Sequence, residues 1–178
     1  MRINAGIHKG RRITAPKKLP VRPTTDFAKE GLFNILNNKY DFTSISVLDL
    51  FSGTGNISYE FASRGTPEIT SVDAHTGCVR FIQATADALD MPITAIRSDV
   101  FKFLENSVRT FNLIFADPPY AMESEEFYKL IDRVFEQNLL VEDGLLVIEH
   151  SKHTELSNAA QFTDQRRYGG SVFSFFST

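Results

Sequence analysis

The sequence contains no tryptophan and only one cysteine, Cys78. A lone cysteine excludes an intramolecular disulfide and every metal site built from several cysteines, so we expect Cys78 to be a small buried hydrophobe. Long hydrophobic runs are missing as well. The start, "MRINAGIHKGRRI", has no apolar signal-peptide core, and no stretch approaches the ~20 apolar residues of a membrane span. We therefore expect a cytoplasmic protein with no membrane partner.

Acidic residues are scarce at the start of the chain, where basic residues gather. Residues 1–30 contain eight Lys or Arg against two acidic residues, a balance of +6, whereas the rest of the chain has a balance of −9. This polarity favours a basic arm for a polyanion, although a solvated surface hairpin would carry the same charges. The candidate phosphate-binding residues of the arm are Lys9, Arg11, Arg12, Lys17, Lys18 and Arg22.

The apolar pattern predicts a hairpin, a helix and then a regular alternation of strands and helices. "RINAGI" and "RRITAP" flank "HKG", which predicts a β-hairpin with Gly10 at its turn. The next helix begins at Thr24, Thr25 or Asp26, after Pro23 closes the extended stretch. Strands are expected at "SVLDLF", "EITSVD", "ITAIRSD", "FNLIFAD" and "LLVIEH", with helices between them, and Gly169-Gly170 joins a last pair, "FTDQRRY" and "SVFSFF".

This order of elements predicts an α/β fold. We expect a Rossmann-like, doubly wound, mostly parallel sheet of seven strands that ends in an antiparallel C-terminal hairpin, with a small β-hairpin at the N-terminus. Two parts are expected: a basic N-terminal hairpin or arm over residues 1–22, and the α/β domain over residues 23–178.

The segment "LDLFSGTGN" ends the first strand of the sheet, where doubly wound folds bind their ligands. Gly53 and Gly55 allow a positive φ and a close approach of a ligand to the backbone, and the next helix offers free N–H groups. Ser58 stands at the third position of G-x-G-x-x-G and the P-loop lysine is missing. The turn therefore favours neither a dinucleotide nor a nucleoside triphosphate.

Acidic residues end three successive strands: Asp49, Asp73 and Asp99. A carboxylate beside the glycine turn would repel a pyrophosphate but favours a ligand with an ammonium group. Asp73 can accept from both ribose hydroxyls, and Asp99 from an adenine amine. Each carboxylate alone is more often a helix cap or a solvated loop residue, but the set with the glycine turn predicts S-adenosylmethionine as cofactor. We include Phe51 and Val100, which follow two of these strands, in the candidate cofactor site.

The run "FADPPYAMES" leaves the fourth strand through a carboxylate, two prolines and an aromatic ring. Pro118 and Pro119 fix φ at about −65° and remove two backbone N–H donors. The turn therefore presents two acceptors, the Asp117 carboxylate and the Pro118 carbonyl. Tyr120 offers a face for stacking, worth ~1–3 kcal/mol per base. Acceptors outside the ring plane favour a tetrahedral amine nitrogen and stabilise its developing charge. The run predicts a catalytic clamp for an exocyclic amine of a base.

Five segments, "HKGRRI", "RPTTDFAKEGLFN", "VLDLFSGTGNISYEFASRG", "FADPPY" and "RRYGGSVFSFF", together resemble the RsmD-type 16S ribosomal RNA guanine-N2 methyltransferases, from about residue 2 to the C-terminus. The resemblance implies a class I S-adenosylmethionine-dependent methyltransferase domain that methylates the N2 amine of a guanine in 16S ribosomal RNA, of the guanine-966 type. The implied partner is 16S ribosomal RNA within a small-subunit particle, and we expect a monomer. The matching positions would be Asp49, Gly53, Gly55, Asp73 and Asp99 at the cofactor, and Asp117, Pro118 and Tyr120 at the guanine.

Other functions stay open at this point. An adenine-N6 methyltransferase on DNA or RNA would use the same D-P-P-Y run. An RNA-binding or assembly protein on an inactive scaffold is disfavoured by the intact Asp49, Gly53, Gly55, Asp117 and Tyr120 set. A dehydrogenase is disfavoured because no hydride-transfer partner is evident. The four histidines show no ligand spacing, so no metal is expected.

Overall fold

The computed structural model describes residues 1–22 and 24–178. The expectation that Pro23 closes the extended stretch lies outside the described residues. Within them, no helix has the length and apolar character needed to cross a membrane.

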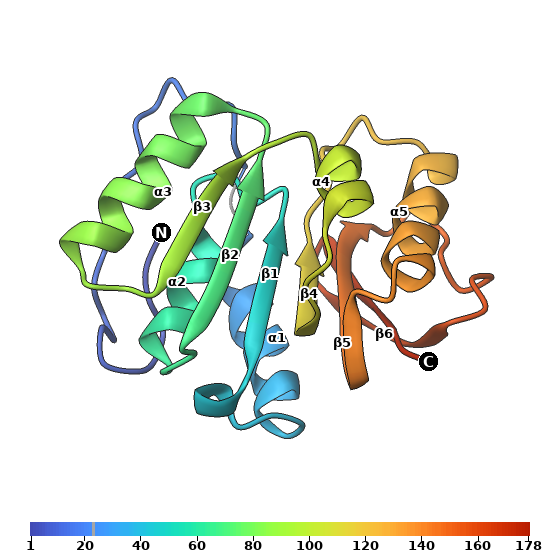
Figure 1. The fold of residues 1–178 in the computed structure, drawn as a ribbon. Coiled ribbons are helices and arrows are strands. Elements are labelled where there is room, and N and C mark those ends of the chain that lie inside the picture. The colour runs from blue at the N-terminus through green and yellow to red at the C-terminus, as the bar shows by residue number, and fades with distance from the viewer. Residues whose placement is uncertain (23) are drawn as a thin grey trace.

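Seven strands of the described residues form one sheet in the order β3-β2-β1-β4-β5-β7-β6 (Figure 1). The last strand, β7 (Ser171–Phe176), runs antiparallel to both β5 and β6 (Phe162–Tyr168). The parallel strands are β1 (Ser46–Leu50), β2 (Glu68–Asp73), β3 (Ile93–Arg97), β4 (Phe111–Ala116) and β5 (Leu140–Ser151). The predicted doubly wound sheet with an antiparallel C-terminal hairpin is confirmed.

Two layers of helices cover this sheet, each over its own hydrophobic core. One layer holds α1 (Asp26–Asn37), α2 (Asn56–Ser63) and α3 (Thr76–Ala88), and the other holds α4 (Val100–Asn106) and α5 (Ser124–Glu136). A short 3-10 helix, Phe42–Ser44, precedes β1. The inward face of α5 is apolar, since Phe127, Leu130, Ile131 and Val134 are all buried.

The winding of the chain reverses between β1 and β4. From β1 the chain moves outward to β2 and β3, and it then returns across β1 to β4 and β5. The helices that follow β1 and β4 lie on opposite faces of the sheet, so their first turns diverge and leave a crevice at the carboxyl ends of these two strands. Asp49, near the end of β1, pairs in register with Ser71 on one side and Phe115 on the other.

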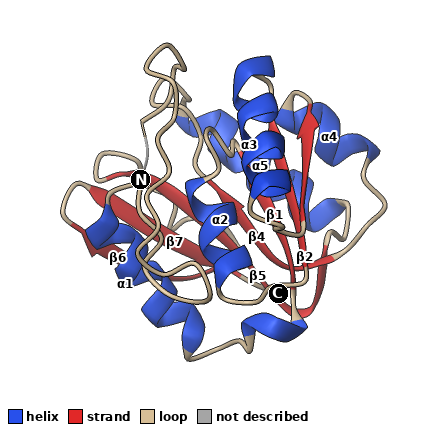
Figure 2. Ribbon diagram, turned by 90° about the vertical axis from the view of Figure 1, so that its left-hand side faces the viewer, coloured by secondary structure: helices blue, strands red, loops and turns tan. Residues whose placement is uncertain are grey.

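The N-terminal segment packs on α2 instead of forming regular strands (Figure 2). Its antiparallel pairing is a bridge between Arg2 and Arg12, because several N–H groups that would extend a ladder bind α2. Asn4 N–H donates to the Glu60 carboxylate, and Ile7 N–H donates to the Ser63 carbonyl at 2.8 Å. On the inner side of the hairpin, buried Ile3 and Ile13 join the core of the sheet. Residues 1–22 are thus continuous with the core.

Candidate active site

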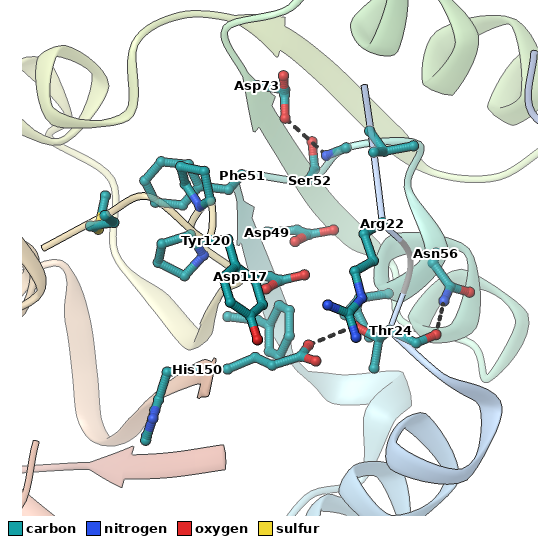
Figure 3. A pocket seen from close by; sticks show the side chains of 18 of the residues that line it. Arg22, Thr24, Asp49, Phe51, Ser52, Asn56, Asp73, Asp117, Tyr120 and His150 are labelled. Atoms are coloured by element: carbon teal, nitrogen blue, oxygen red, sulfur yellow. Dashed lines mark hydrogen bonds between the residues drawn. The ribbon is translucent and has the colours of Figure 1, made fainter. Parts of the chain in front are cut away.

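A cavity of about 840 Å³ lies at the carboxyl ends of the parallel strands (Figure 3). Its walls come from the turns after β1, β2 and β4, the end of β5, the start of α4, and residues 19–22 of the N-terminal segment. The structure brings nearly all predicted cofactor and catalytic residues to this one space: Asp49, Phe51, Gly53, Asp73, Asp99, Val100, Asp117, Pro118, Pro119 and Tyr120. Gly55 is the exception.

Gly53 and Gly55 both adopt left-handed backbone conformations, with φ of 55° and 90°, as the turn predicts. A Cβ on Gly53 would lie 3.3 Å from Val21 Cγ1, at the cavity wall. A Cβ on Gly55 would instead lie 2.7 Å from the ring of buried Tyr59, behind the turn. Gly53 therefore borders the space for a ligand, whereas Gly55 is required by the packing of the helix that follows.

Asp73 ties the glycine turn to the end of β2. Its Oδ2 accepts from Gly53 N–H and its Oδ1 from His75 N–H, both at 2.9 Å. Each oxygen keeps a further lone pair for a ligand hydroxyl. Asp99 caps α4, because its Oδ1 accepts from Lys102 N–H at 3.0 Å. The helix-cap role left open by the sequence is therefore observed for Asp99, which also borders the cavity.

Asp49 lies at the floor of the cavity and is almost fully buried. Ser58 Oγ donates to Asp49 Oδ2 at 2.6 Å and lies 2.6 Å from Ser71 Oγ. Burial raises the pKa of Asp49 to about 7, although the Ser58 hydrogen bond opposes this shift. A cation beside this carboxylate would restore its charge, so the floor favours a positively charged ligand group.

Two further features of the turn fit S-adenosylmethionine. Ser52 Oγ is buried and has no hydrogen-bond partner within the described residues, and Ser52 lines the cavity. Phe51 lines it too, with a φ of 55°, a strained value for a residue other than glycine. An unpaired hydroxyl, an aromatic side chain and three carboxylates suit the hydroxyls, ring and amines of this cofactor.

The turn after β4 forms the opposite half of the cavity. Asp117 N–H donates to Leu50 O at 3.3 Å, which holds this turn beside the end of β1. Figure 3 shows the carboxylates of Asp49 and Asp117 one above the other, on the side of the cavity that faces Arg22. Burial, followed by the charge of Glu149, raises the pKa of Asp117 well above its usual range. Tyr120 stands at the mouth, with 81% of its surface exposed.

Glu149, at the end of β5, is a site residue that the sequence interpretation missed. It lies in the cavity wall and is 8% exposed. Thr24 Oγ1 donates to its Oε2 at 2.6 Å, and Ser171 Oγ donates to its Oε1 at 3.0 Å. Burial raises its pKa, while these two hydrogen bonds and Arg22 oppose the shift. The sequence did contain a sign of this role, because Glu149 lies near the end of a buried strand, as Asp49 does.

Arg22 was expected on the arm with the phosphate-binding residues, but its side chain lies at the cavity. Its guanidinium carbon is 5.6 Å from the centroid of the Tyr120 ring, within the range of a cation–π contact. Its charge lowers the pKa of both Asp117 and Glu149, against the effect of burial. Arg22 is thus an internal cation for the two carboxylates.

The remaining predicted phosphate-binding residues lie away from the cavity lining. All of them are exposed: Lys9, Arg11, Arg12, Lys17 and Lys18. Leu19 and Val21, which follow them, line the cavity beside the glycine turn. Residues 19–22 of the N-terminal segment therefore form part of the cavity wall, whereas the exposed basic residues before them do not.

His150 is a buried member of the cavity wall. Its Nε2 lies 2.7 Å from Ser174 Oγ and its Nδ1 lies 2.8 Å from Ser151 O. Burial lowers the pKa of His150, which favours the neutral ring. Across residues 1–22 and 24–178, no group of three or more His, Cys, Asp or Glu side chains is arranged to hold a metal ion.

Comparisons with known proteins show which family the chain belongs to. The family model described as "Conserved hypothetical protein 95" matches residues 1–177. The putative rRNA methyltransferase YlbH of Bacillus subtilis is 32% identical over 161 residues, which cover 88% of this chain and 85% of the relative. Ribosomal RNA small subunit methyltransferase D of Escherichia coli is 27% identical over 150 residues, which cover 84% of this chain and 74% of the relative.

Solved structures share the fold over most or all of the chain. The hypothetical protein TTHA0928 of Thermus thermophilus has a TM-score of 0.86 at 24% identity and covers 100% of this chain and 99% of its own. A 16S rRNA N2 G1207 methyltransferase from T. thermophilus was solved with AdoMet and guanosine and has a TM-score of 0.71 at 19% identity. The match covers 89% of this chain and 44% of that methyltransferase. The fold is that of the class I methyltransferases. Together with the match over residues 1–177, this places the chain in the Conserved hypothetical protein 95 family, that of the RsmD-type methyltransferases.

Proposed function

We propose that this protein transfers a methyl group from S-adenosylmethionine to the exocyclic N2 amine of a guanine in 16S ribosomal RNA, with the guanine-966 type of target that the resemblance implies. The observation that carries the proposal is one cavity that joins a glycine turn and three strand-end carboxylates to the Asp117–Tyr120 clamp. The names of the curated relatives, which specify small-subunit ribosomal RNA, support this class of substrate.

The cofactor half of the cavity is the end of the sheet from β1 to β3. When bound, S-adenosylmethionine supplies a methyl group on a positively charged sulfonium. Asp49 on the floor would face its cationic end, the Gly53 backbone would border its methionine part, and Asp73 would accept from its ribose. Phe51 and Asp99 would lie at its adenine. This assignment uses the buried carboxylate and the open wall at Gly53 together.

The target half supplies acceptors for an amine. The Pro118 carbonyl and the Asp117 carboxylate can each accept one N2–H of guanine, which directs the nitrogen lone pair out of the ring plane. As the N–CH₃ bond forms, the electrons of the S–CH₃ bond remain on sulfur, and N2 must lose a proton. Asp117, when ionised, is well suited to take it, because burial and nearby charge raise its pKa. Tyr120 stacks on the base at the mouth.

The exposed basic residues of the N-terminal segment supply the binding energy for the RNA backbone. Phosphate contacts position a nucleic acid without reading its sequence, and these side chains have no ion-pair partner among the described residues. Lys17 and Lys18 precede Leu19 and Val21 at the cavity, so a strand of RNA held there would pass close to the clamp.

The experiment that tests this function is labelled methyl transfer to small ribosomal subunits from cells that lack the protein. We expect label in RNA, and nuclease digestion should release N2-methylguanosine. Release of N6-methyladenosine would contradict the guanine assignment and leave the clamp intact. Absence of label in both the particle and its naked RNA would contradict the enzymatic function. The Asp117→Ala variant provides the inactive control.

A further inference from the structure

The second carboxylate of the target half, Glu149, has no role in the clamp chemistry described above. It lies in the wall of the same cavity as Asp117 and Tyr120, yet it comes from a different strand. Its charge is close enough to Asp117 to raise the pKa of that residue. Two carboxylates at one end of a cavity repel each other, so this arrangement favours a ligand that brings several N–H donors to them.

The orientation of Glu149 is fixed from both sides. Thr24 Oγ1 donates to one oxygen at 2.6 Å and Ser171 Oγ donates to the other at 3.0 Å. Thr24 belongs to the segment before α1, and Ser171 begins β7, so two distant parts of the chain converge on this side chain. Each carboxylate oxygen keeps a second lone pair. Glu149 is therefore a preorganised acceptor.

Arg22 is a cation whose charge favours the ionised form of both carboxylates. Its guanidinium lies over the Tyr120 ring and lowers the pKa of both Asp117 and Glu149. A guanidinium has a planar N–C–N frame that carries several N–H donors. The N1–H, C2 and N2–H₂ atoms of guanine form the same frame, whereas the corresponding edge of adenine has an acceptor at N1.

We propose that Glu149 is the specificity-determining residue of the site: its carboxylate accepts N1–H of the target guanine while Asp117 and the Pro118 carbonyl accept the two N2–H groups. This inference rests on the proposed methyl transfer to guanine and adds the feature that the D-P-P-Y run lacks. An adenine would place its N1 lone pair against the Glu149 carboxylate and be repelled.

The test uses 2-aminopurine, which keeps the exocyclic N2 amine but has an acceptor at N1. Small-subunit particles are assembled with guanine or with 2-aminopurine at the nucleotide that the wild-type protein methylates. We expect the wild type to methylate guanine about 10- to 100-fold faster than 2-aminopurine, as a hydrogen bond to a charged acceptor would give. Equal rates on both bases would overturn the inference. This test uses only the wild-type protein, so it does not depend on whether a variant folds.

The Glu149→Gln variant provides the reciprocal result. Its amide can still accept from one of the two hydroxyls, and its NH₂ can donate to N1 of 2-aminopurine. We expect the guanine preference to fall at least tenfold, with the affinity for S-adenosylhomocysteine unchanged. The matched control is Glu126→Gln, an exposed residue in the first turn of α5, which should keep the wild-type preference. A Glu149→Gln protein that binds S-adenosylhomocysteine and keeps that preference would also overturn the inference. Failure of the wild type to methylate guanine at all would instead refute the proposed function.

Discussion

The two halves of the cavity hold their carboxylates in different ways. On the cofactor side, Asp73 and Asp99 accept backbone N–H groups. The donors to Asp73 are Gly53, in the turn after β1, and His75, and the donor to Asp99 is Lys102 in the first turn of α4. On the target side, Asp117 and Glu149 line the same cavity and the charge of Glu149 acts on Asp117, while Glu149 is held by side-chain hydroxyls of Thr24 and Ser171. The hydrogen bonds of the cofactor half therefore join segments at most 20 positions apart, whereas Glu149 in the target half is held in part by Thr24, 125 positions away.

This difference has a physical consequence for binding. Carboxylates that accept backbone N–H groups keep one geometry at little cost, which suits a ligand that binds in the same way in each reaction cycle. Carboxylates that are buried next to each other have a raised pKa and need donors or a cation. Arg22 supplies that cation in this structure. The target half thus carries two buried carboxylates whose charge is partly offset by one cation of the same chain.

The largest expected effect isolates the target half. Asp117→Ala should reduce the rate of methyl transfer by at least about 10²-fold, because one preorganised acceptor of the developing charge is removed. The affinity for S-adenosylhomocysteine, measured by calorimetry, should stay the same, because the proposed contact of Asp117 is with the amine. Methyl transfer at a normal rate, or a parallel loss of cofactor binding, would show that the two halves do not act separately.

Gly53→Val tests the cofactor half in the same way. The substitution places a branched side chain at a backbone φ of 55°. Its Cβ would lie 3.3 Å from Val21 Cγ1, and its two methyl groups would extend beyond that point. We expect binding of S-adenosylhomocysteine to be abolished. Gly10→Val is the matched control, since Gly10 also has a positive φ, of 84°, but no atom lies within 4 Å of its Cβ position. Unchanged affinity in the Gly53 variant would contradict the role of the turn.

The same contrast explains what the sequence predicts and what it does not. The cofactor half follows from single segments, because "LDLFSGTGN" contains Asp49, Gly53 and the start of the helix in order. The target half was predicted only as far as one segment reaches, which is the D-P-P-Y run. Glu149 lies 125 positions from Thr24 in the sequence. A pattern within one segment cannot predict a hydrogen bond between residues so far apart. Arg22 was assigned by charge alone, which does not specify where a side chain lies.

Asp49 gives a smaller effect, which appears as a dependence on pH. Its pKa is about 7 in the folded protein against 3.8 without burial, so its contribution to stability is complete below about pH 4 and is lost as the pH rises through 7. Asn at this position still accepts from Ser58 and cannot ionise. Without cofactor, Asp49→Asn should therefore be more stable than wild type at pH 8, by no more than about 4 kcal/mol, and similar at pH 4. Denaturant unfolding across this range measures the difference; a constant difference would contradict the shifted pKa.

The smallest effect is expected from the basic hairpin, which lies outside both halves. Arg11 and Arg12 are exposed, whereas neighbouring Ile13 is buried in the core. Changing both arginines to Ala removes charge without removing this anchor. We expect a higher apparent KM for the ribosomal substrate and a flatter salt dependence of RNA binding. On single-stranded RNA, the slope of log affinity against log salt concentration should fall by about 0.7 for each phosphate that is no longer neutralised. The affinity for S-adenosylhomocysteine should stay the same.

A charge-matched control separates a phosphate contact from a change in net charge. Lys102 and Lys129 are exposed on α4 and α5, across the sheet from the hairpin, and changing both to Ala removes the same two charges. This control should keep the wild-type KM and salt slope. If both double variants raise KM equally, the effect is one of overall charge. If the Arg11 and Arg12 variant methylates normally across the salt series, the hairpin is a solvated surface, and the RNA is held by the target half and by residues 17–22 alone.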